Sequence, residues 1–502
     1  MRVCWVAVVF IAQLGCGGRT SLLFGPGRDA APEAGALADA RVDQGAGDLP
    51  VTWPDLTAPD QASADLPPPK PWVVTAATPG FSAHVVGEGV ATDSVGNAHV
   101  VGTYMGKATF GTTLVDFAGI RDVFAVKVSP AGAFAWITAD GGTGSEWGRA
   151  IAVASDGGVV IAGEYSQLLG FGPGTIGPLG GYVDLFVARL SPAGTIQWVQ
   201  ALGGLAYENV RAVAVDATGN IFLAAVFSSS MTVAGATHTA KGDPDLIVIK
   251  LSPAGQALWA VSAGSTGYDR IGGVAADGAG GCVFGGTFTG QATLGGKTIQ
   301  GGCVVRLDSD GAVLWIAAPT GTVSVDDLAR DKAGNVHVAG SYGGTASFGG
   351  VSLTAPAVGT DHTYAARLAP GGGFIWASWV GRSNMVVFQG LSAHPRRIAL
   401  DAAGNSYVAG IFGQSVPYGF TTLTSAGGRD IVVVKVGPGG KLLWAVGAGG
   451  PQDDTCGGVA SDPAGNLFVT GGFVGQAVFG TQTVVAQGYE DLFLWRIPAP
   501  GL

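Results

Sequence analysis

Residues 71–77 read PWVVTAA and residues 490–497 read EDLFLWRI, and these two stretches decide the fold. The first belongs to a set of seven segments centred on tryptophan, and the second to a set of seven segments that end in a cation. Six tryptophan segments follow a cation segment, whereas Trp72 precedes all of them and Arg496 has no tryptophan segment after it. The two unmatched segments complete each other only if the chain closes into a ring. We therefore expect an all-β, seven-bladed β-propeller of four-stranded blades, with the strand around Trp72 completing the last blade.

Each repeat contains four predicted strands, as residues 211–216, 220–227, 245–252 and 257–264 illustrate. The first strand carries alanine at one position in every repeat and the fourth carries tryptophan. Blades crowd near the axis and separate at the rim, so small residues belong inside and large ones outside. The tryptophans are therefore expected to pack between blades, with sugar-stacking surfaces as the alternative. They are Trp72, Trp136, Trp198, Trp259, Trp315, Trp376 and Trp444.

Charged residues recur at two further positions of the repeat. Many first strands end in an Asp-x-x-Gly-Asn turn, such as Asp93–Asn97, in which aspartate caps the turn and glycine takes the left-handed conformation. We expect the third-strand cations to form structural ion pairs with these aspartates. Calcium binding at the turns is the alternative. The cations are Lys127, Arg189, Lys250, Arg306, Arg367, Lys435 and Arg496.

The stretches GVASDPAGNLFVTGGF at 458–473 and DIVVVKVGPGGKLLW at 430–444 resemble the bacterial β-propeller repeat family often called SBBP. The resemblance covers residues 72–497. It implies a secreted or surface lipoprotein with the propeller fold. It implies no catalytic residues, because the family has no shared catalytic set.

Composition excludes several classes of protein. The 502-residue chain contains 86 glycines, which would break most helices of a helical bundle. Its formal net charge is −10, so it lacks the positive surface that binds nucleic acid or anionic lipid. Cys282, Cys303 and Cys456 are an odd set without suitable spacing for a bridge, and we expect them to be small buried residues.

The N-terminus predicts export. Residues 3–14 form an apolar run that is too short for a bilayer, which needs roughly 20 residues. Residues 13–16, Gln-Leu-Gly-Cys, resemble a lipobox, so residues 1–16 are predicted to be a lipoprotein signal peptide with Cys16 as the lipidated residue. An ordinary secretory peptide is the alternative. Residues 17–70 are rich in Ala, Pro and Asp and are predicted to be a disordered tether that precedes the propeller at 71–502. Gly17 favours the outer membrane or cell surface.

Acidic residues recur in the loops that lead into the first strands, where they are expected to surround the mouth of the channel. This incomplete acidic ring is the candidate binding site, for a cation or for a cationic or hydroxylated ligand. Solvated loop acids are the alternative. The residues are Glu146, Glu208, Asp269, Asp454, Asp326 and Asp327.

The sequence contains no catalytic motif, no metal-ligand spacing and no cofactor motif that we could identify. The favoured function is therefore a lipid-anchored surface propeller that serves in binding, adhesion or assembly, as a monomer, with a glycan or an envelope protein as partner and no nucleic acid. An enzyme acting on an envelope or extracellular polymer, a lyase or hydrolase, is the alternative. Its candidate residues lie in the irregular stretch 379–397 and are Arg382, Asn384, His394, Arg396 and Arg397. A purely structural envelope protein is the third hypothesis.

Overall fold

The computed structural model describes residues 71–77, 80–172, 174–355, 362–382, 397–419 and 421–499. Every element in these ranges is a β-strand. No helix that could span a bilayer occurs in them. The predicted signal peptide with Cys16 and the tether lie outside the described residues, as do Asn384, His394, Arg396 and the side chain of Arg382.

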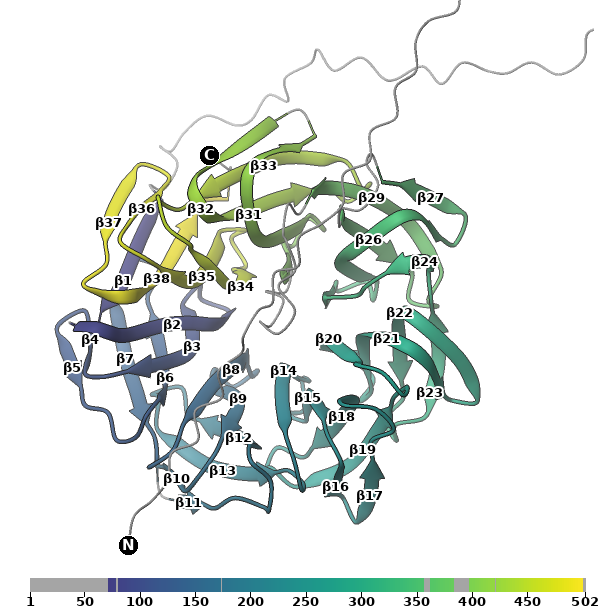
Figure 1. Ribbon diagram of the computed structural model, residues 1–502, viewed down its shortest axis with the longest axis horizontal. Coiled ribbons are helices and arrows are strands. Elements are labelled where there is room, and N and C mark those ends of the chain that lie inside the picture. The colour runs from purple at the N-terminus through teal and green to yellow at the C-terminus, as the bar shows by residue number, and fades with distance from the viewer. Residues whose placement is uncertain are drawn as a thin grey trace, which may run out of the picture. The chain divides into compact units, whose positions relative to one another are not determined.

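The strands form mainly antiparallel sheets that stand around a central axis, which is a β-propeller arrangement (Figure 1). Four sheets in the described ranges have four strands each, while β1 to β7, β34, β35 and β38 are joined in one ten-stranded sheet, in which β2 pairs parallel with β38. In the sheet β8-β9-β12-β13, for example, each strand pairs with the next. The first strands are β2 (Gly80–Thr92), β8 (Glu146–Val153), β14 (Glu208–Val215), β20 (Arg270–Ala276), β25 (Asp327–Arg330), β30 (Arg397–Leu400) and β34 (Thr455–Ser461). The second strands are β3 (Ala98–Met105), β9 (Val159–Tyr165), β15 (Ile221–Phe227), β21 (Cys282–Leu294), β26 (Val336–Phe348), β31 (Ser406–Tyr418) and β35 (Leu467–Phe473).

The third and fourth strands lie farther from the axis. The third strands are β6 (Asp122–Val128), β12 (Asp184–Leu190), β18 (Asp245–Leu251), β22 (Lys297–Leu307), β28 (His362–Leu368), β32 (Thr421–Val436) and β38 (Gly488–Ile497). The fourth strands are β7 (Phe134–Asp140), β13 (Ile196–Leu202), β19 (Ala257–Ala263), β23 (Val313–Ala317), β29 (Phe374–Arg382) and β33 (Leu442–Ala448). Short additional strands lie at the periphery: β4 (Ala108–Phe110), β5 (Thr113–Val115), β10 (Leu169–Phe171), β11 (Gly174–Ile176), β16 (Ser230–Val233), β17 (Ala236–Thr239), β24 (Thr320–Val323), β27 (Val351–Thr354), β36 (Gln476–Phe479) and β37 (Gln482–Val485).

Strand β1 (Trp72–Ala77) joins the two ends of the repeat array. It pairs antiparallel with β38, with Trp72 opposite Arg496 and Ala76 opposite Leu492. Strand β38 also pairs with β35, so β1 adds a fourth strand to β34-β35-β38, and its last residues also pair with β4. The predicted pairing of the two unmatched segments is therefore present.

The tryptophans link neighbouring sheets, as the sequence predicts. The indole N–H of Trp136 donates a hydrogen bond to the carbonyl of Pro192, in the turn between β12 and β13 of the next sheet, at 3.1 Å. The indole face lies against Gly194 of the same turn, where a Cβ would come within 2.7 Å of the ring. In the described ranges, six tryptophans donate to the equivalent turn carbonyl, which belongs to Ser309 for Trp259 and to a proline for the other five: Trp72, Trp136, Trp198, Trp259, Trp315 and Trp376.

Among the described residues, the predicted ion pairs between third-strand cations and the aspartate that opens the turn form in four repeats, and in a fifth Arg189 pairs with Asp156, two residues further into the turn, at 2.6 Å. The four pairs are Lys127–Asp93 at 3.1 Å, Arg306–Asp277 at 2.9 Å, Arg367–Asp331 at 3.1 Å and Lys435–Asp401 at 3.9 Å. Lys250 departs from the pattern and donates to the carbonyls of Gly280 and Ser309 instead. Burial favours the neutral form of Asp93, but hydrogen bonds from Asn97, His99 and Lys127 outweigh it and hold the pKa of that carboxyl well below its usual range. These contacts give the turn aspartates a structural role.

The first strands carry β-bulges that face the axis. The pairing register shifts between Gly87 and Gly89 in β2, between Gly148 and Ala150 in β8, and between Val210 and Ala212 in β14. One residue at each shift has no partner in the ladder, and a bulge turns such a residue away from the regular pleat. The residues at these positions are Glu88, Arg149 and Arg211, which bring charge to the centre of the ring.

Candidate functional site

The structure places four of the predicted acids inside the protein, at junctions between sheets. Glu146 and Glu208 are at most 1% exposed, and Asp269 and Asp454 are fully buried. Each accepts a hydrogen bond from the backbone N–H four residues earlier, as in Gly142 to Glu146 at 3.0 Å and Gly204 to Glu208 at 3.2 Å. Asp454 accepts the N–H groups of Gly450 and Val474. The four acids are therefore neither solvated nor gathered into one site, and they hold loop backbone in place.

A second acid faces several of them from the preceding sheet. Asp122 interacts with Glu146, Asp184 with Glu208, and Asp430 with Asp454. Burial, followed by smaller effects of the partner carboxylates, raises the pKa of Glu146 to about 7, of Glu208 to about 8 and of Asp454 to about 7. When both carboxylates are unprotonated, one oxygen of Glu208 and one oxygen of Asp184 are buried without a hydrogen-bond partner among the described residues. A proton shared between Glu208 and Asp184 would satisfy both of these oxygens.

The partner acids form a repeat that was not recognised in the sequence. Each stands five residues before the third-strand cation, at positions 122, 184, 245, 430 and 491, whereas glycine and histidine occupy the positions at 301 and 362. Their carboxylates accept the N–H groups of the preceding loop, as in Lys241 to Asp245 at 2.8 Å. No group of three or more metal-binding side chains occurs in the described ranges.

The last two predicted acids belong to a different environment. Asp326 accepts a hydrogen bond from the Ser324 hydroxyl at 2.7 Å. Asp327 lines an inner cavity of about 140 Å³ and accepts N–H groups from Leu328 and Ile398. Burial raises the pKa of Asp327, while the positive charge of Arg397 opposes this effect. Asp327 thus lines the channel, and the charges of both Asp326 and Asp327 act on Arg211.

The channel holds a larger cavity of about 500 Å³ that opens beside the inner one. Both cavities are lined by the bulge residues Glu88, Arg149 and Arg211, together with Arg397 and Gly457. The larger cavity also includes His84, Arg121 and Glu490. A cavity of this size suits a small ligand or a few units of a polymer, and it is the candidate functional site.

Arg149 is fully paired. Its guanidinium donates to Glu164 at 2.8 Å and to Glu88 at 3.2 Å. Glu164 is almost completely buried and accepts the N–H of Val210 at 2.7 Å with its other oxygen. Although burial disfavours its charged form, Glu164 and Glu88 raise the pKa of Arg149 further. This network fixes one wall of the cavity.

Arg211 and Arg397 have different surroundings. Arg397 donates to the carbonyl of Gly457 at 2.9 Å. Burial and the positive charge of Arg397 lower the pKa of Arg211 to about 9, so Arg211 stays a cation at neutral pH. Arg121 lies over the Trp147 ring, with its guanidinium carbon 5.4 Å from the ring centre, and Arg149 lies 5.9 Å from the same centre. The channel therefore gathers guanidinium groups in an otherwise acidic chain.

Arg397 belongs to the stretch that the sequence analysis named for an enzyme, whereas the bulge residues Glu88, Arg149 and Arg211 were not predicted, although the repeat contains a signal for them. Three residues before the invariant alanine of each first strand stand Glu88, Arg149, Arg211, Gly272, Asp326, Arg396 and Gly457. This position varies between charged residues and glycine while its neighbours keep the repeat pattern. Such variation at one register position would have marked the channel lining.

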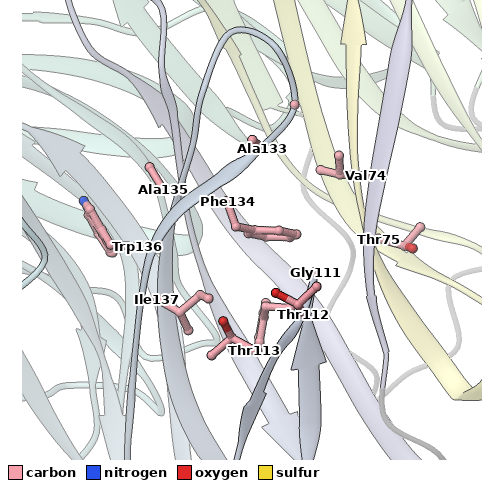
Figure 2. Close-up of a pocket in the computed structure, with 12 residues that line it drawn as sticks. Val74, Thr75, Gly111, Thr112, Thr113, Ala133, Phe134, Ala135, Trp136 and Ile137 are labelled. Carbon is pink, nitrogen blue, oxygen red and sulfur yellow. The ribbon is translucent and has the colours of Figure 1, made fainter.

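A second cavity lies at the rim and has a different character. It is formed by Val74 and Thr75 of β1, the β4–β5 hairpin around Thr112, and the start of β7. Figure 2 shows the Phe134 ring projecting toward Val74 and Thr112. Its lining contains no ionisable side chain. It offers apolar surface and hydroxyl groups but no acid, base or metal ligand.

Comparisons with known proteins give distant similarities in sequence and in structure. No family model matches the chain. An uncharacterised WD repeat-containing protein of Acanthamoeba polyphaga mimivirus is 22% identical over 462 residues, which cover 71% of this chain and 33% of that protein. The chain thus spans about a third of the length of this relative. The chain has a β-propeller-type fold.

Several solved structures resemble the propeller at low identity. Virginiamycin B lyase from Staphylococcus aureus has a TM-score of 0.44 at 9% identity, covering 85% of this chain and 99% of that chain. The Neurospora crassa Pan2 WD40 domain has a TM-score of 0.35 at 10% identity, covering 85% of this chain and 96% of that chain. A polysaccharide lyase named as an ulvan lyase has a TM-score of 0.37 at 13% identity, covering 78% of this chain and 92% of that chain. Identities this low concern the fold alone.

Proposed function

We propose that this chain is an exported, lipid-anchored β-propeller that binds a glycan or another envelope component in its central channel, as an adhesion or assembly scaffold. The observation that carries the proposal is the 500 Å³ cavity, whose walls come from β2, β3, β8, β14, β30, β34 and β38. Residues contributed by so many strands are held rigidly by the ring, and rigid scaffolds favour recognition.

The proposal includes seven blades of the SBBP type. Seven tryptophan segments and seven cation segments in the sequence support this number, as does the pairing of β1 with β38. In this arrangement β34, β35, β38 and β1 form the seventh blade.

The proposal also includes export and anchoring through Cys16, to the outer membrane or cell surface. The apolar run at residues 3–14 and the lipobox-like residues 13–16 support it. Expression with a labelled fatty acid tests the anchor, with Cys16→Ala as the control. Label that persists in the variant would contradict lipidation at this residue.

Ligand binding is tested by applying the full chain to an array of glycans and cell-envelope polymers. The proposal expects a specific hit that is lost when the cavity is altered at Arg149, whose two carboxylate partners fix the wall. Binding that survives every change in the channel would move the site to the outer surface. A blank array would favour a purely structural envelope protein.

An enzyme is the second candidate, and one contact favours it. His84 Nδ1 lies 3.5 Å from Glu490 Oε2 inside the larger cavity, and the imidazole is 32% exposed. A histidine held by a carboxylate is a common general base. A lyase or hydrolase of this kind would cleave the polymer that binds in the channel, and His84→Ala would abolish cleavage while leaving binding intact.

A further inference from the structure

We infer that the channel selects a ligand that carries an oxyanion, a carboxylate or a sulfate, and that Arg211 is the residue that binds it. This inference rests on the proposed ligand binding in the channel and specifies its chemistry. It differs from the expectation drawn from the sequence, which placed acids for a cationic or hydroxylated ligand at the channel mouth.

Arg211 is a cation that no described residue holds in a hydrogen bond or ion pair. It lies in β14 at a bulge, it lines both cavities, and no hydrogen bond or ion pair joins its guanidinium to any residue in the described ranges. It is only partly exposed. Removing a charge from water without pairing it is costly, so a half-buried and unpaired guanidinium is poised to gain from an anionic partner.

The carboxylates near Arg211 are already engaged by other groups. Glu88 and Glu164 accept hydrogen bonds from Arg149. Asp327 accepts the N–H groups of Leu328 and Ile398. The anions of the channel wall are therefore committed elsewhere, and Arg211 keeps its donors for a ligand.

Arg397 and Arg149 reinforce the preference for an anion. Their positive charges disfavour the charged form of Arg211, an effect that the negative charges of Asp327 and Asp326 oppose. An oxyanion placed among the three guanidinium groups would relieve this repulsion. The planar fork of arginine matches the two oxygens of a carboxylate or sulfate, which gives the site geometric selectivity as well as charge.

The test is calorimetric titration of the full chain with three oligosaccharides: trigalacturonate, sulfated galactotriose and neutral galactotriose. We expect one or both of the anionic probes to bind and the neutral probe to bind at least tenfold more weakly. The stronger anionic probe tells whether a carboxylate or a sulfate is the natural group. Arg211→Met should weaken the binding of the anionic probe roughly 10- to 100-fold, because the loss of a hydrogen bond to a charged group lowers affinity by about this factor.

Two variants serve as controls. Lys332→Met removes the same charge from an exposed turn and should leave binding unchanged. Arg211→Lys keeps the charge without the fork and should restore part of the affinity. Arg211→Met should melt at or above the temperature of the natural protein, because Arg211 has no partner to lose.

The outcomes distinguish a failure of oxyanion selection by Arg211 from a failure of the proposed glycan binding in the channel. Equal binding of neutral and anionic probes, unchanged in Arg211→Met, would overturn the oxyanion inference and leave a glycan-binding propeller. Absence of binding by all three probes would overturn glycan binding and the inference together. A fall in melting temperature for Arg211→Met would show that Arg211 is structural, which also overturns the inference.

Discussion

Trp72 lies opposite Arg496 in the antiparallel pair between β1 and β38, and the Trp72 indole also donates to the carbonyl of Pro130 in the next sheet at 3.1 Å. One short strand thus completes one sheet and contacts its neighbour. Deleting residues 71–77 from the full chain should remove both contacts and expose the edge of β38. We expect the cooperative thermal transition to broaden or disappear in calorimetry.

The control deletes seven residues from the predicted tether, such as 50–56. This chain should unfold like the natural protein. If the chain without residues 71–77 also unfolds normally, β1 does not close the ring.

The contact between Trp136 and Gly194 provides a second prediction. Gly194 has a φ of 85°, and a Cβ there would lie 2.7 Å from the indole ring. Gly235 has a φ of 78° and no atom near its Cβ direction within 4 Å. Gly235→Ala should cost about 1–2 kcal/mol from backbone strain alone. Gly194→Ala should cost about 1–3 kcal/mol more, because it adds a steric clash.

Urea unfolding of Gly194→Ala and Gly235→Ala measures the difference between their free energies of unfolding. Equal losses of stability would mean that the turn can move away from the tryptophan, and that this contact does not hold the sheets together.

The acid pairs predict a dependence of stability on pH. Burial raises the pKa of Glu208 to about 8 from an ordinary value of 4.5, so the folded protein binds more protons than the unfolded chain between these values. The free energy of unfolding should therefore fall as pH rises from 4.5 through 8. Glu208→Gln can still accept from Gly204 and can donate to Asp184 without a titrating proton.

The melting temperature of Glu208→Gln should lie several degrees above that of the natural protein at pH 8.5 and close to it at pH 5. The control Asp310→Asn, at an exposed turn, should leave the melting temperature unchanged at both pH values. A variant that is destabilised equally at both pH values would contradict the shared proton.

Cysteine reactivity gives a further prediction. Cys282, Cys303 and Cys456 are free and buried, and burial raises the pKa of Cys303 and of Cys456 to about 12. In residues 71–502 a thiol reagent at pH 8 should react with none of the three until the protein unfolds, and then with all of them. Rapid labelling of the folded protein would show that the sheets open locally.

The sequence predicted the strands, the ion pairs of the turns and the tryptophan contacts because each of these repeats along the chain. A feature that recurs at a fixed position, such as Trp136 or Asp93, reports what every blade needs. The same reasoning placed Glu146 and Glu208 at the channel mouth. The structure instead buries their carboxylates against loop amides, because an acid that recurs can also be a backbone cap.

The channel lining was harder to predict for the opposite reason. Arg211, Arg149 and Glu88 share one register position but differ in charge, so they do not form a motif. The orientation of these side chains depends on β-bulges, which no local pattern in the sequence predicts. The pairing of Arg149 with Glu88 and Glu164, which leaves Arg211 alone, depends on contacts between sheets and becomes visible only in three dimensions.

The pairing of β1 with β38 has a consequence for biosynthesis. The first of the described strands, β1, finds its partner only when the last of them, β38, has been made. The intermediate sheets can form in order, but the ring stays open until synthesis is almost complete, with two unpaired strand edges exposed. Under the proposed export, this late closure would keep the polypeptide unfolded enough for translocation until β38 has arrived.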